Sequence, residues 1–261
     1  MAQTALSRDL TALRDAGQKG LIPFISAGDP DLETTAQILL ALAEAGATAI
    51  EIGVPFSDPI ADGPVIQAAS QRAIDAGATL DRILTMLHGM QDRLPPTVIF
   101  SYLNPIDRMG FATFARRARE AGVSALLVTD ATPGTEPDLE QALRDNGLDL
   151  ICLVAPTTPH DRLATIVASA SGFIYVVARR GVTGRGSEQQ EATGHIEALR
   201  SLTNLPLYVG FGVREREDVV RLQQHADGVI VGSALVELLH ETPREQRAQV
   251  AGDYLRRLRG V

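Results

Sequence analysis

The chain has 261 residues, of which 45% are hydrophobic, and a formal net charge of −8 at pH 7. The negative charge argues against a nucleic-acid partner, which is usually bound by a basic surface, and no apolar run approaches the roughly 18 residues needed to cross a bilayer. The N-terminus lacks the apolar core of a signal peptide, and the single cysteine, Cys152, leaves no intrachain disulfide. We therefore expect a cytoplasmic protein with no membrane partner.

Eight short runs rich in apolar and β-branched residues recur along the chain. In order they are LIPFIS (21–26), AIEIGV (49–54), TVIFSY (97–102), ALLV (125–128), LICLVA (150–155), FIYVVA (173–178), LYVGFG (207–212) and GVIVG (228–232). Their continuous apolar character fits parallel strands that are covered on both faces.

Amphipathic segments lie between these runs, over residues 32–44, 107–121, 136–146, 161–170 and 214–225. Each strand–helix unit spans roughly the 30 residues of a βαβ crossover. The pattern predicts an α/β protein, a single-domain (β/α)8 TIM barrel over residues 1–261, with an extra N-terminal helix over 3–17 and a last helix over 244–259. An open doubly wound sheet is the alternative, but SAGDPD after the first run lacks the GxGxxG fingerprint of that fold.

The most informative stretch, IEIGVPFSDPIADG (50–63), places a carboxylate inside an apolar strand. Alternation along the strand predicts that Ile50 and Ile52 face one side and Glu51 the other. If the isoleucines meet the helices, Glu51 projects into the mouth of the barrel, and removal from water raises the pKa of its carboxyl toward neutrality, which suits proton transfer. A structural acid, hydrogen-bonded to a buried tyrosine or to the backbone, is the alternative.

The loop after this strand is long, includes FSDPIADGPVIQ (56–67), and carries Asp58 and Asp62. Asp62 is expected to fold over the same mouth as Glu51, and two carboxylates in unlike surroundings can divide proton transfer and charge stabilisation between them. Both aspartates precede turn-forming residues, so a role in the turn is the alternative, above all for Asp58. The other strand ends offer no array of acidic or histidine ligands, so we expect no metal site.

Glycines gather at the ends of the last two strands, in GFG (210–212) and GS (232–233), and each leads into a helix. Backbone N–H groups can approach an anion there, and the loops after strands seven and eight of barrels frequently bind phosphate. A glycine-rich segment over 178–194, which contains Gly184, has the composition of a mobile lid. These glycines predict a phosphorylated substrate, with ordinary tight turns as the alternative.

Lysine is nearly absent from the chain. Of 24 basic residues only Lys19 is a lysine, and it precedes the first strand. Imine chemistry, whether with a carbonyl substrate or with pyridoxal phosphate, needs a lysine inside the site. We therefore expect no covalent imine catalysis within this chain.

The motifs as a set resemble those of a known family. IEIGVPFSDPIADG is similar to the signature of the tryptophan synthase alpha chain, a family with a (β/α)8 barrel, and the resemblance extends over nearly the whole chain. Further matching motifs are PFISAGDP (23–30), SYLNPI (101–106), GFIYVVARRGVTG (172–184), VGFGV (209–213) and GSALV (232–236).

The resemblance implies retro-aldol cleavage of indole-3-glycerol phosphate to indole and glyceraldehyde 3-phosphate, in tryptophan biosynthesis. Glu51 matches the family's catalytic acid and base, which protonates C3 of the indole ring. Asp62 matches the second catalytic acid, which stabilises positive charge at the ring nitrogen. Because the protonated ring is the electron sink, this reaction requires no lysine imine.

The resemblance also implies which residues bind the substrate. Tyr175 would orient Glu51, and Thr183 would belong to the lid. The implied indole slot is lined by Leu21, Phe100, Leu127 and Ile230, and the implied phosphate site is formed by Gly184, Gly212, Gly232 and Ser233. Leu21 stands where some relatives carry an aromatic residue.

Members of the family pair with a beta chain that binds pyridoxal phosphate, and two alpha chains flank a beta dimer. Asp58 and Pro59 match the loop that faces this partner, and the resemblance implies no cofactor in this chain itself. Three alternatives stay open: a stand-alone lyase that releases free indole, a non-catalytic binding subunit on the same scaffold, and an unrelated phosphosugar isomerase.

Overall fold

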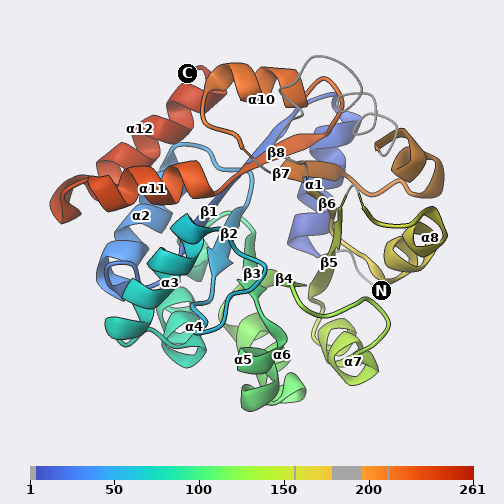
Figure 1. The fold of residues 1–261 in the computed structure, drawn as a ribbon, viewed down its shortest axis with the longest axis horizontal. Coiled ribbons are helices and arrows are strands. Elements are labelled where there is room, and N and C mark those ends of the chain that lie inside the picture. Colours follow the sequence, from blue (N-terminus) through green and yellow to red (C-terminus); the bar gives the residue numbers. More distant parts are fainter. Residues whose placement is uncertain (1–3, 156, 178–195, 211) are drawn as a thin grey trace.

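Eight parallel strands form the centre of the molecule. The structure, a computed structural model, describes residues 4–155, 157–177, 196–210 and 212–261. The strands close into a barrel in chain order (Figure 1). Their bounds are β1 Gly20–Ser26, β2 Ile50–Gly53, β3 Thr97–Ser101, β4 Val123–Val128, β5 Asp149–Val154, β6 Ile174–Val177, β7 Leu207–Gly210 and β8 Gly228–Val231. The predicted (β/α)8 barrel is confirmed, and every strand overlaps its predicted range.

Helices surround the barrel (Figure 1). They include α1 Ala5–Asp15, α2 Leu32–Glu44, α3 Pro64–Asp75, α4 Leu80–His88, α5 Leu103–Met109, α6 Phe111–Glu120, α7 Pro137–Asp145, α8 His160–Ser169, α10 Arg216–Leu222, α11 Ser233–Glu241 and α12 Arg247–Arg259. The predicted N-terminal helix is confirmed, and the last helix begins at Arg247 because Arg244–Gln246 form a 3-10 turn. None of the described helices combines the length and hydrophobicity of a membrane span.

Two segments differ from the prediction. The long loop after β2 ends at Gly63, because Pro64 begins α3, and the fixed φ and missing N–H of proline suit the first helical position. The segment predicted as one helix over 107–121 forms two helices, α5 and α6, which meet at Gly110. Gly110 has a φ of 83°, a left-handed conformation that ends a helix and that glycine adopts without a steric penalty.

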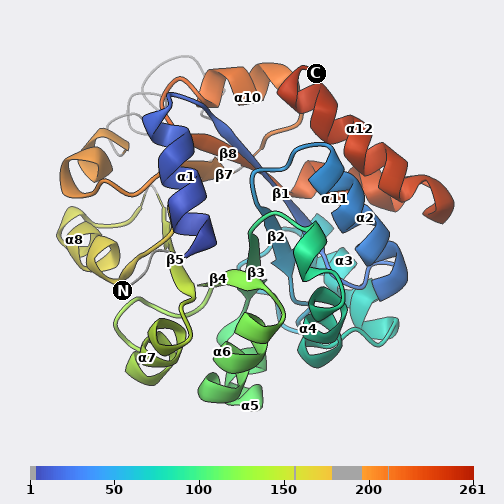
Figure 2. The same cartoon turned by 180° about the vertical axis from the view of Figure 1, so that it is seen from behind.

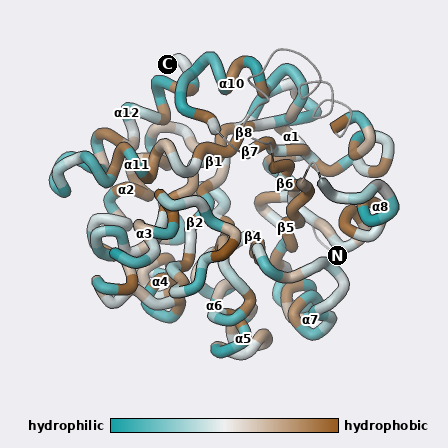
Figure 3. The backbone as a smooth tube through the Cα atoms, in the orientation of Figure 1, coloured by the Kyte–Doolittle hydropathy of each residue, from teal (hydrophilic) through white to brown (hydrophobic). Residues whose placement is uncertain are grey.

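Side chains along each strand alternate between two cores. Outward-facing residues such as Ile25 and Ile50 pack between the strands and the helices, whereas inward-facing ones such as Ile22 and Val98 fill the barrel. Several of the strands are accordingly brown in the hydropathy colouring, whereas the outer helices carry much teal (Figure 3). This alternation decides which strand residues can reach a site inside the barrel.

The amino end of the barrel is closed by a helix. Helix α1 crosses this end (Figure 2), and its Leu6 and Leu10 are fully buried in the inner core. Thr4 and Ser7 donate hydrogen bonds to the buried carboxylate of Asp149, at the start of β5. The loops that can form an active site therefore lie at the opposite, carboxyl end.

Candidate active site

Glu51 of β2 lies inside the barrel. Ile50 and Ile52 pack outward against the helices, so alternation turns Glu51 inward, where the residue is 0% exposed. In the sheet register it stands between Phe24 of β1 and Val98 of β3. The predicted inward orientation of Glu51 is confirmed.

Among the described residues, no hydrogen-bond donor contacts the carboxyl group of Glu51. Neither of its oxygens has a hydrogen-bond partner among the described residues, so no contact in this part of the chain supports the alternative of a purely structural acid. Burial alone raises the pKa of Glu51 from 4.5 to about 8. The carboxyl group therefore keeps its proton at neutral pH and can donate it.

Asp62, in the loop between β2 and α3, is held by Tyr102. The Tyr102 hydroxyl donates a hydrogen bond of 3.1 Å to Oδ2 of Asp62 and accepts one of 2.9 Å from the N–H of Ala61. The Tyr102 ring stacks on Phe56, with ring centroids 4.9 Å apart. Two loop residues and one aromatic ring therefore fix this hydroxyl beside the carboxylate.

Burial affects both groups of this pair. Partial burial raises the pKa of Asp62, and the hydrogen bond from Tyr102 acts in the opposite direction. Burial and the neighbouring charge of Asp62 raise the pKa of Tyr102 to about 12, so its hydroxyl stays a donor. Tyr102 was not predicted from the sequence, although the residue directly follows β3, at the rim where barrel enzymes hold their functional groups.

Asp62 faces an aromatic wall. A small cavity beside it is lined by residues of β1, β2, β3 and α3 and of the segments that follow β2 and β3, among them Phe24, Gly53, Phe100 and Tyr102. The rings of Phe24 and Phe100 meet edge to face, with centroids 5.2 Å apart. A side chain on residue 53 would collide with the Phe24 ring, so Gly53 makes room for the wall. The predicted slot residue Phe100 lies here, whereas Phe24 was missed.

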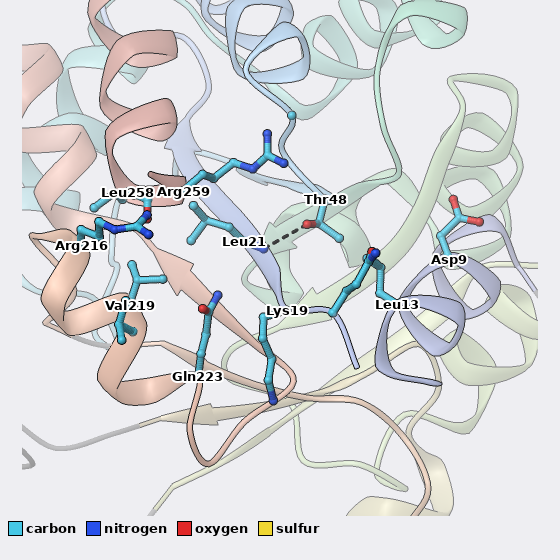
Figure 4. A pocket seen from close by; sticks show the side chains of 13 residues that line it. Asp9, Leu13, Lys19, Leu21, Thr48, Arg216, Val219, Gln223, Leu258 and Arg259 are labelled. Carbon is cyan, nitrogen blue, oxygen red and sulfur yellow. Dashed lines mark hydrogen bonds between the residues drawn. The ribbon is translucent and has the colours of Figure 1, made fainter. Parts of the chain in front are cut away.

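Leu21 is a correction to the predicted slot. On β1, Ile22 and Phe24 face the barrel interior, so alternation turns Leu21 outward, into the core between strands and helices. Leu21 also lines a hollow at the amino end of the barrel, together with Leu13 and Arg216 (Figure 4). Leu21 therefore lies on the wrong face and at the wrong end of β1 to meet a substrate beside Asp62.

Tyr175 of β6 lies close to both acids. Burial raises the pKa of Tyr175 well above its ordinary value, and the charges of Glu51 and Asp62 raise it further. Its hydroxyl occupies the space that a side chain on Gly210 would need. Tyr175 makes no hydrogen bond to Glu51, since neither Glu51 oxygen has a partner among the described residues.

The predicted residues Leu127 and Ile230 face the barrel interior, where both are part of the inner core. Leu127 is in register with Phe100, and Ile230 is in register with Gly210. Both side chains therefore add to the apolar barrel interior beside Phe100 and Gly210.

The glycines predicted to bind phosphate lie at the ends of strands β7 and β8. Gly232 is the N-cap of α11, and Ser233 is the first residue of that helix, whose first N–H groups have no partner within the helix. Gly212 follows β7 with a φ of 68°, in the left-handed region. Gly232 is also next to Phe24, so an anion at this helix would adjoin the aromatic wall. Thr183 and Gly184, with the predicted lid, lie outside the described residues.

The predicted partner-facing residues, Asp58 and Pro59, lie at the tip of the loop between β2 and α3. Asp58 is exposed and accepts a hydrogen bond of 2.6 Å from Ser57. Ile60 beside them is 86% exposed. Across the described ranges no three acidic, histidine or cysteine side chains cluster as metal ligands.

Comparisons with known proteins point to one family. A family model described as "Tryptophan synthase alpha chain" matches residues 10–257. The tryptophan synthase alpha chain of Burkholderia thailandensis is 44% identical over 259 residues, which cover 98% of this chain and 96% of the relative. That of Laribacter hongkongensis is 44% identical over 250 residues, which cover 93% of this chain and 95% of the relative.

Solved structures show the same similarity. Tryptophan synthase subunit alpha from Legionella pneumophila superposes with a TM-score of 0.89 at 32% identity, covering 99% of this chain and 98% of that chain. A chain of the tryptophan synthase complex from Pyrococcus furiosus superposes with a TM-score of 0.84 at 35% identity, covering 93% of this chain and 98% of that chain.

Proposed function

The chain belongs to the tryptophan synthase alpha chain family, and we propose that it is the lyase subunit that cleaves indole-3-glycerol phosphate to indole and glyceraldehyde 3-phosphate. One observation carries this proposal. Glu51 is a fully buried acid with no partner among the described residues and a pKa of about 8, and it faces the barrel interior close to Tyr175. Such a group is poised to exchange protons with a bound substrate.

Glu51 acts first as a general acid. It transfers its proton to C3 of the indole ring, which leaves a positive charge on the ring nitrogen. The hydroxyl group on the adjacent side-chain carbon then loses its proton to the Glu51 carboxylate, and the bond between that carbon and C3 breaks. The bond electrons return to the ring to restore indole, and the side chain leaves as an aldehyde. Glu51 ends the cycle protonated, ready for the next substrate.

Asp62 stabilises the charge that forms in between. Tyr102 holds Oδ2 of Asp62, which leaves Oδ1 to accept a hydrogen bond from the ring N–H as its positive charge develops. A fixed carboxylate at that point costs no reorganisation when the charge appears, which is how preorganised groups lower a barrier. Tyr102 is therefore proposed as the residue that positions Asp62.

The rest of the site fits the two ends of the substrate. Phe24 and Phe100 offer an aromatic wall for the flat indole ring. Gly212, Gly232 and Ser233 stand at the carboxyl rim, where backbone N–H groups and the α11 dipole suit a phosphate. Gly184 and Thr183 are proposed to complete the phosphate site and the lid.

The chain is proposed to work with a beta chain, two alpha chains with one beta dimer. The solved Pyrococcus furiosus chain comes from a tryptophan synthase complex, which supports this partner. Ile60, beside Asp58 and Pro59, is an exposed apolar side chain at the tip of the loop that such a partner would cover. Pyridoxal phosphate would be bound by the beta chain, since Lys19, the single lysine of this chain, lies at the amino end of the barrel with its Nζ on the carbonyl of Ala226. We place this biosynthetic step in the cytoplasm.

Incubating the purified chain with indole-3-glycerol phosphate and following the release of indole tests the proposal. We expect slow cleavage by the chain alone and a large gain when a beta chain of the family is added. Equal rates with and without the beta chain would favour the stand-alone lyase. A folded protein that releases no indole under either condition would contradict the proposed reaction.

A further inference from the structure

A second hollow lies at the amino end of the barrel, away from the site that contains Glu51. It has a volume of about 470 Å³ and is lined by residues of α1, β1, α10 and α12 and of the connections beside them (Figure 4). This volume lies in the range of sites that hold small molecules. We call it the amino-terminal hollow, and its lining includes Asp9, Lys19, Leu21, Thr48, Arg216 and Arg259.

Positive charge dominates the lining of the amino-terminal hollow. Lys19, Arg216 and Arg259 line it, and the single carboxylate in the lining is Asp9. Asp9 pairs with Arg8 at 3.1 Å, and in Figure 4 it lies apart from the two guanidinium groups. None of the three cations has an ion-pair partner among the described residues, although the whole chain carries a net charge of −8. Unneutralised cations around one hollow attract an anion.

The two arginines are held in place by the carboxyl ends of helices. Nη1 of Arg259 donates a hydrogen bond of 2.8 Å to the carbonyl of Ala45, directly after α2, and Nη1 of Arg216 donates one of 3.5 Å to the carbonyl of Leu258 in α12. These contacts stabilise the helix ends. Each guanidinium group has five N–H donors, so most of them stay free for a ligand.

Arg259 is further fixed by a glycine. Gly46 has a φ of 82°, and the guanidinium group of Arg259 occupies the space that a side chain on Gly46 would fill. A side chain that is already ordered loses little entropy when a ligand binds. The position of this cation is therefore preorganised.

Part of the wall of the hollow is apolar, and several of its uncharged polar groups can donate hydrogen bonds. Leu13, Leu21 and Val219 form apolar surface. The Thr48 hydroxyl accepts a hydrogen bond of 3.0 Å from the N–H of Leu21, which leaves its own proton to donate. The amide of Gln223 adds two further N–H donors. Apolar surface beside converging donors fits a ligand with an apolar body and one anionic group.

We propose that the amino-terminal hollow binds a small organic anion, with its phosphate or carboxylate group on Arg216 and Arg259 and its apolar body against Leu21 and Val219. The established chemistry of barrels places catalysis at the other end, so this is a separate ligand site. The proposal does not depend on the lyase reaction.

Titration of the ¹⁵N-labelled full chain with phenyl phosphate, followed by NMR, tests the proposal. We expect the amide signals of Gly46, Thr48 and Gln223 to shift in a saturable way. Benzoate tests a carboxylate in place of the phosphate, and inorganic phosphate alone should bind more weakly because it lacks the apolar body. Benzyl alcohol, which lacks the charge, should not shift these signals. Phenyl phosphate that shifts signals only around Gly232 and Ser233 would overturn the proposal.

Variants give a second measurement. Arg216→Gln and Arg259→Gln should each raise the dissociation constant of phenyl phosphate at the hollow by about tenfold or more, because a charge-assisted hydrogen bond is lost. Arg257→Gln is the control: it removes the same charge as either variant, from the same helix as Arg259, and its side chain lies over Tyr254, outside the hollow. Equal affinities in all three variants would contradict the proposal. If either test variant is unstable, the titration of the unaltered chain still shows whether the hollow binds phenyl phosphate.

Discussion

Buried carboxylates occur at both ends of this barrel, but their surroundings differ. At the amino end, Asp149 is 4% exposed and accepts hydrogen bonds from Thr4 and Ser7. Asp227, before β8, accepts 2.6 Å and 2.7 Å bonds from Arg200 and the N–H of Leu207. Both acids tie chain segments together.

Glu51 is buried more completely than either aspartate and has no such partners among the described residues. A buried acid without partners destabilises a fold, and such a cost persists where a function requires it. The buried aspartates at the amino end therefore stabilise the barrel, whereas the buried acid near the carboxyl end, Glu51, is kept reactive.

The largest expected effect is on the rate of cleavage. Glu51→Gln should fold normally and lower the cleavage rate by at least about 100-fold, because the amide cannot transfer the proton. Asp149→Asn is the matched control, an isosteric neutral variant at the other end, and its rate per folded molecule should change only a few-fold. Steady-state measurement of indole release on both proteins checks this. Similar losses of cleavage rate in the two variants would contradict the claim that only the acid near the carboxyl end takes part in the reaction.

Asp62→Asn should have the next largest effect, about 10- to 100-fold on kcat, because a neutral amide stabilises the developing charge on the ring nitrogen less well. The effect on KM should be smaller, since the charge forms only as the reaction proceeds. Separate determination of kcat and KM tests this. A rise in KM at constant kcat would make Asp62 a binding residue only.

Glu51→Gln and Asp149→Asn should change the free energy of unfolding in opposite directions. Folded Glu51 holds its proton up to a pKa of about 8, whereas an unfolded glutamate ionises near 4.3. Between these values the unfolded state binds fewer protons, so the free energy of unfolding falls as pH rises through this window.

Glu51→Gln removes this pH-dependent fall in the free energy of unfolding, because glutamine does not ionise. The substitution should therefore raise the free energy of unfolding by roughly a few kcal/mol at pH 8 and by little near pH 4.5. Asp149→Asn should lower it by about 1–2 kcal/mol, because charge-assisted hydrogen bonds become neutral ones. Denaturant unfolding at pH 5 and pH 8 measures both changes. A Glu51→Gln protein that is no more stable at pH 8 than the unaltered chain would mean that Glu51 has a stabilising partner.

The barrel and the orientation of Glu51 could be predicted because each strand is a continuous apolar run and one of them contains an acid. In β2 the acid marks the inner face, and the isoleucines mark the outer one. In β1 the first five residues of the run LIPFIS are apolar, and its one polar residue, Ser26, stands at the very end. By alternation Ser26 shares the face of Phe24, but a serine at the end of a strand marks a face far more weakly than an acid inside one, and the wrong residue was assigned to the slot.

Contacts between distant segments could not be predicted from the sequence for a different reason. Tyr102 and Asp62 are 40 residues apart, and they meet because the ends of β2 and β3 are neighbours in the barrel. The amino-terminal hollow likewise joins α1 and α12, from the two ends of the chain. Neither arrangement produces a pattern within one stretch of the sequence, so each is seen only in the folded barrel.

The smallest expected effect concerns Tyr102, the positioning residue at the carboxyl end. Tyr102→Phe keeps the ring that stacks on Phe56 but removes the hydrogen bond to Asp62. We expect kcat to fall by about tenfold, which is typical of losing one hydrogen bond to a charged group. Because that bond lowers the pKa of Asp62, the acid limb of the rate profile should also move to higher pH.

A double-variant cycle distinguishes positioning of Asp62 from a general loss of packing. If Tyr102 acts through Asp62, Tyr102→Phe should cost little in a protein that already carries Asp62→Asn. Tyr254→Phe is the control for removing a buried hydroxyl, since the Tyr254 hydroxyl donates to the carbonyl of Arg214 away from the acids, and its rate should stay unchanged. Fully additive losses from Tyr102→Phe and Asp62→Asn would show that Tyr102 supports the fold of the rim, as Thr4 and Ser7 support the amino end, and does not orient the carboxylate.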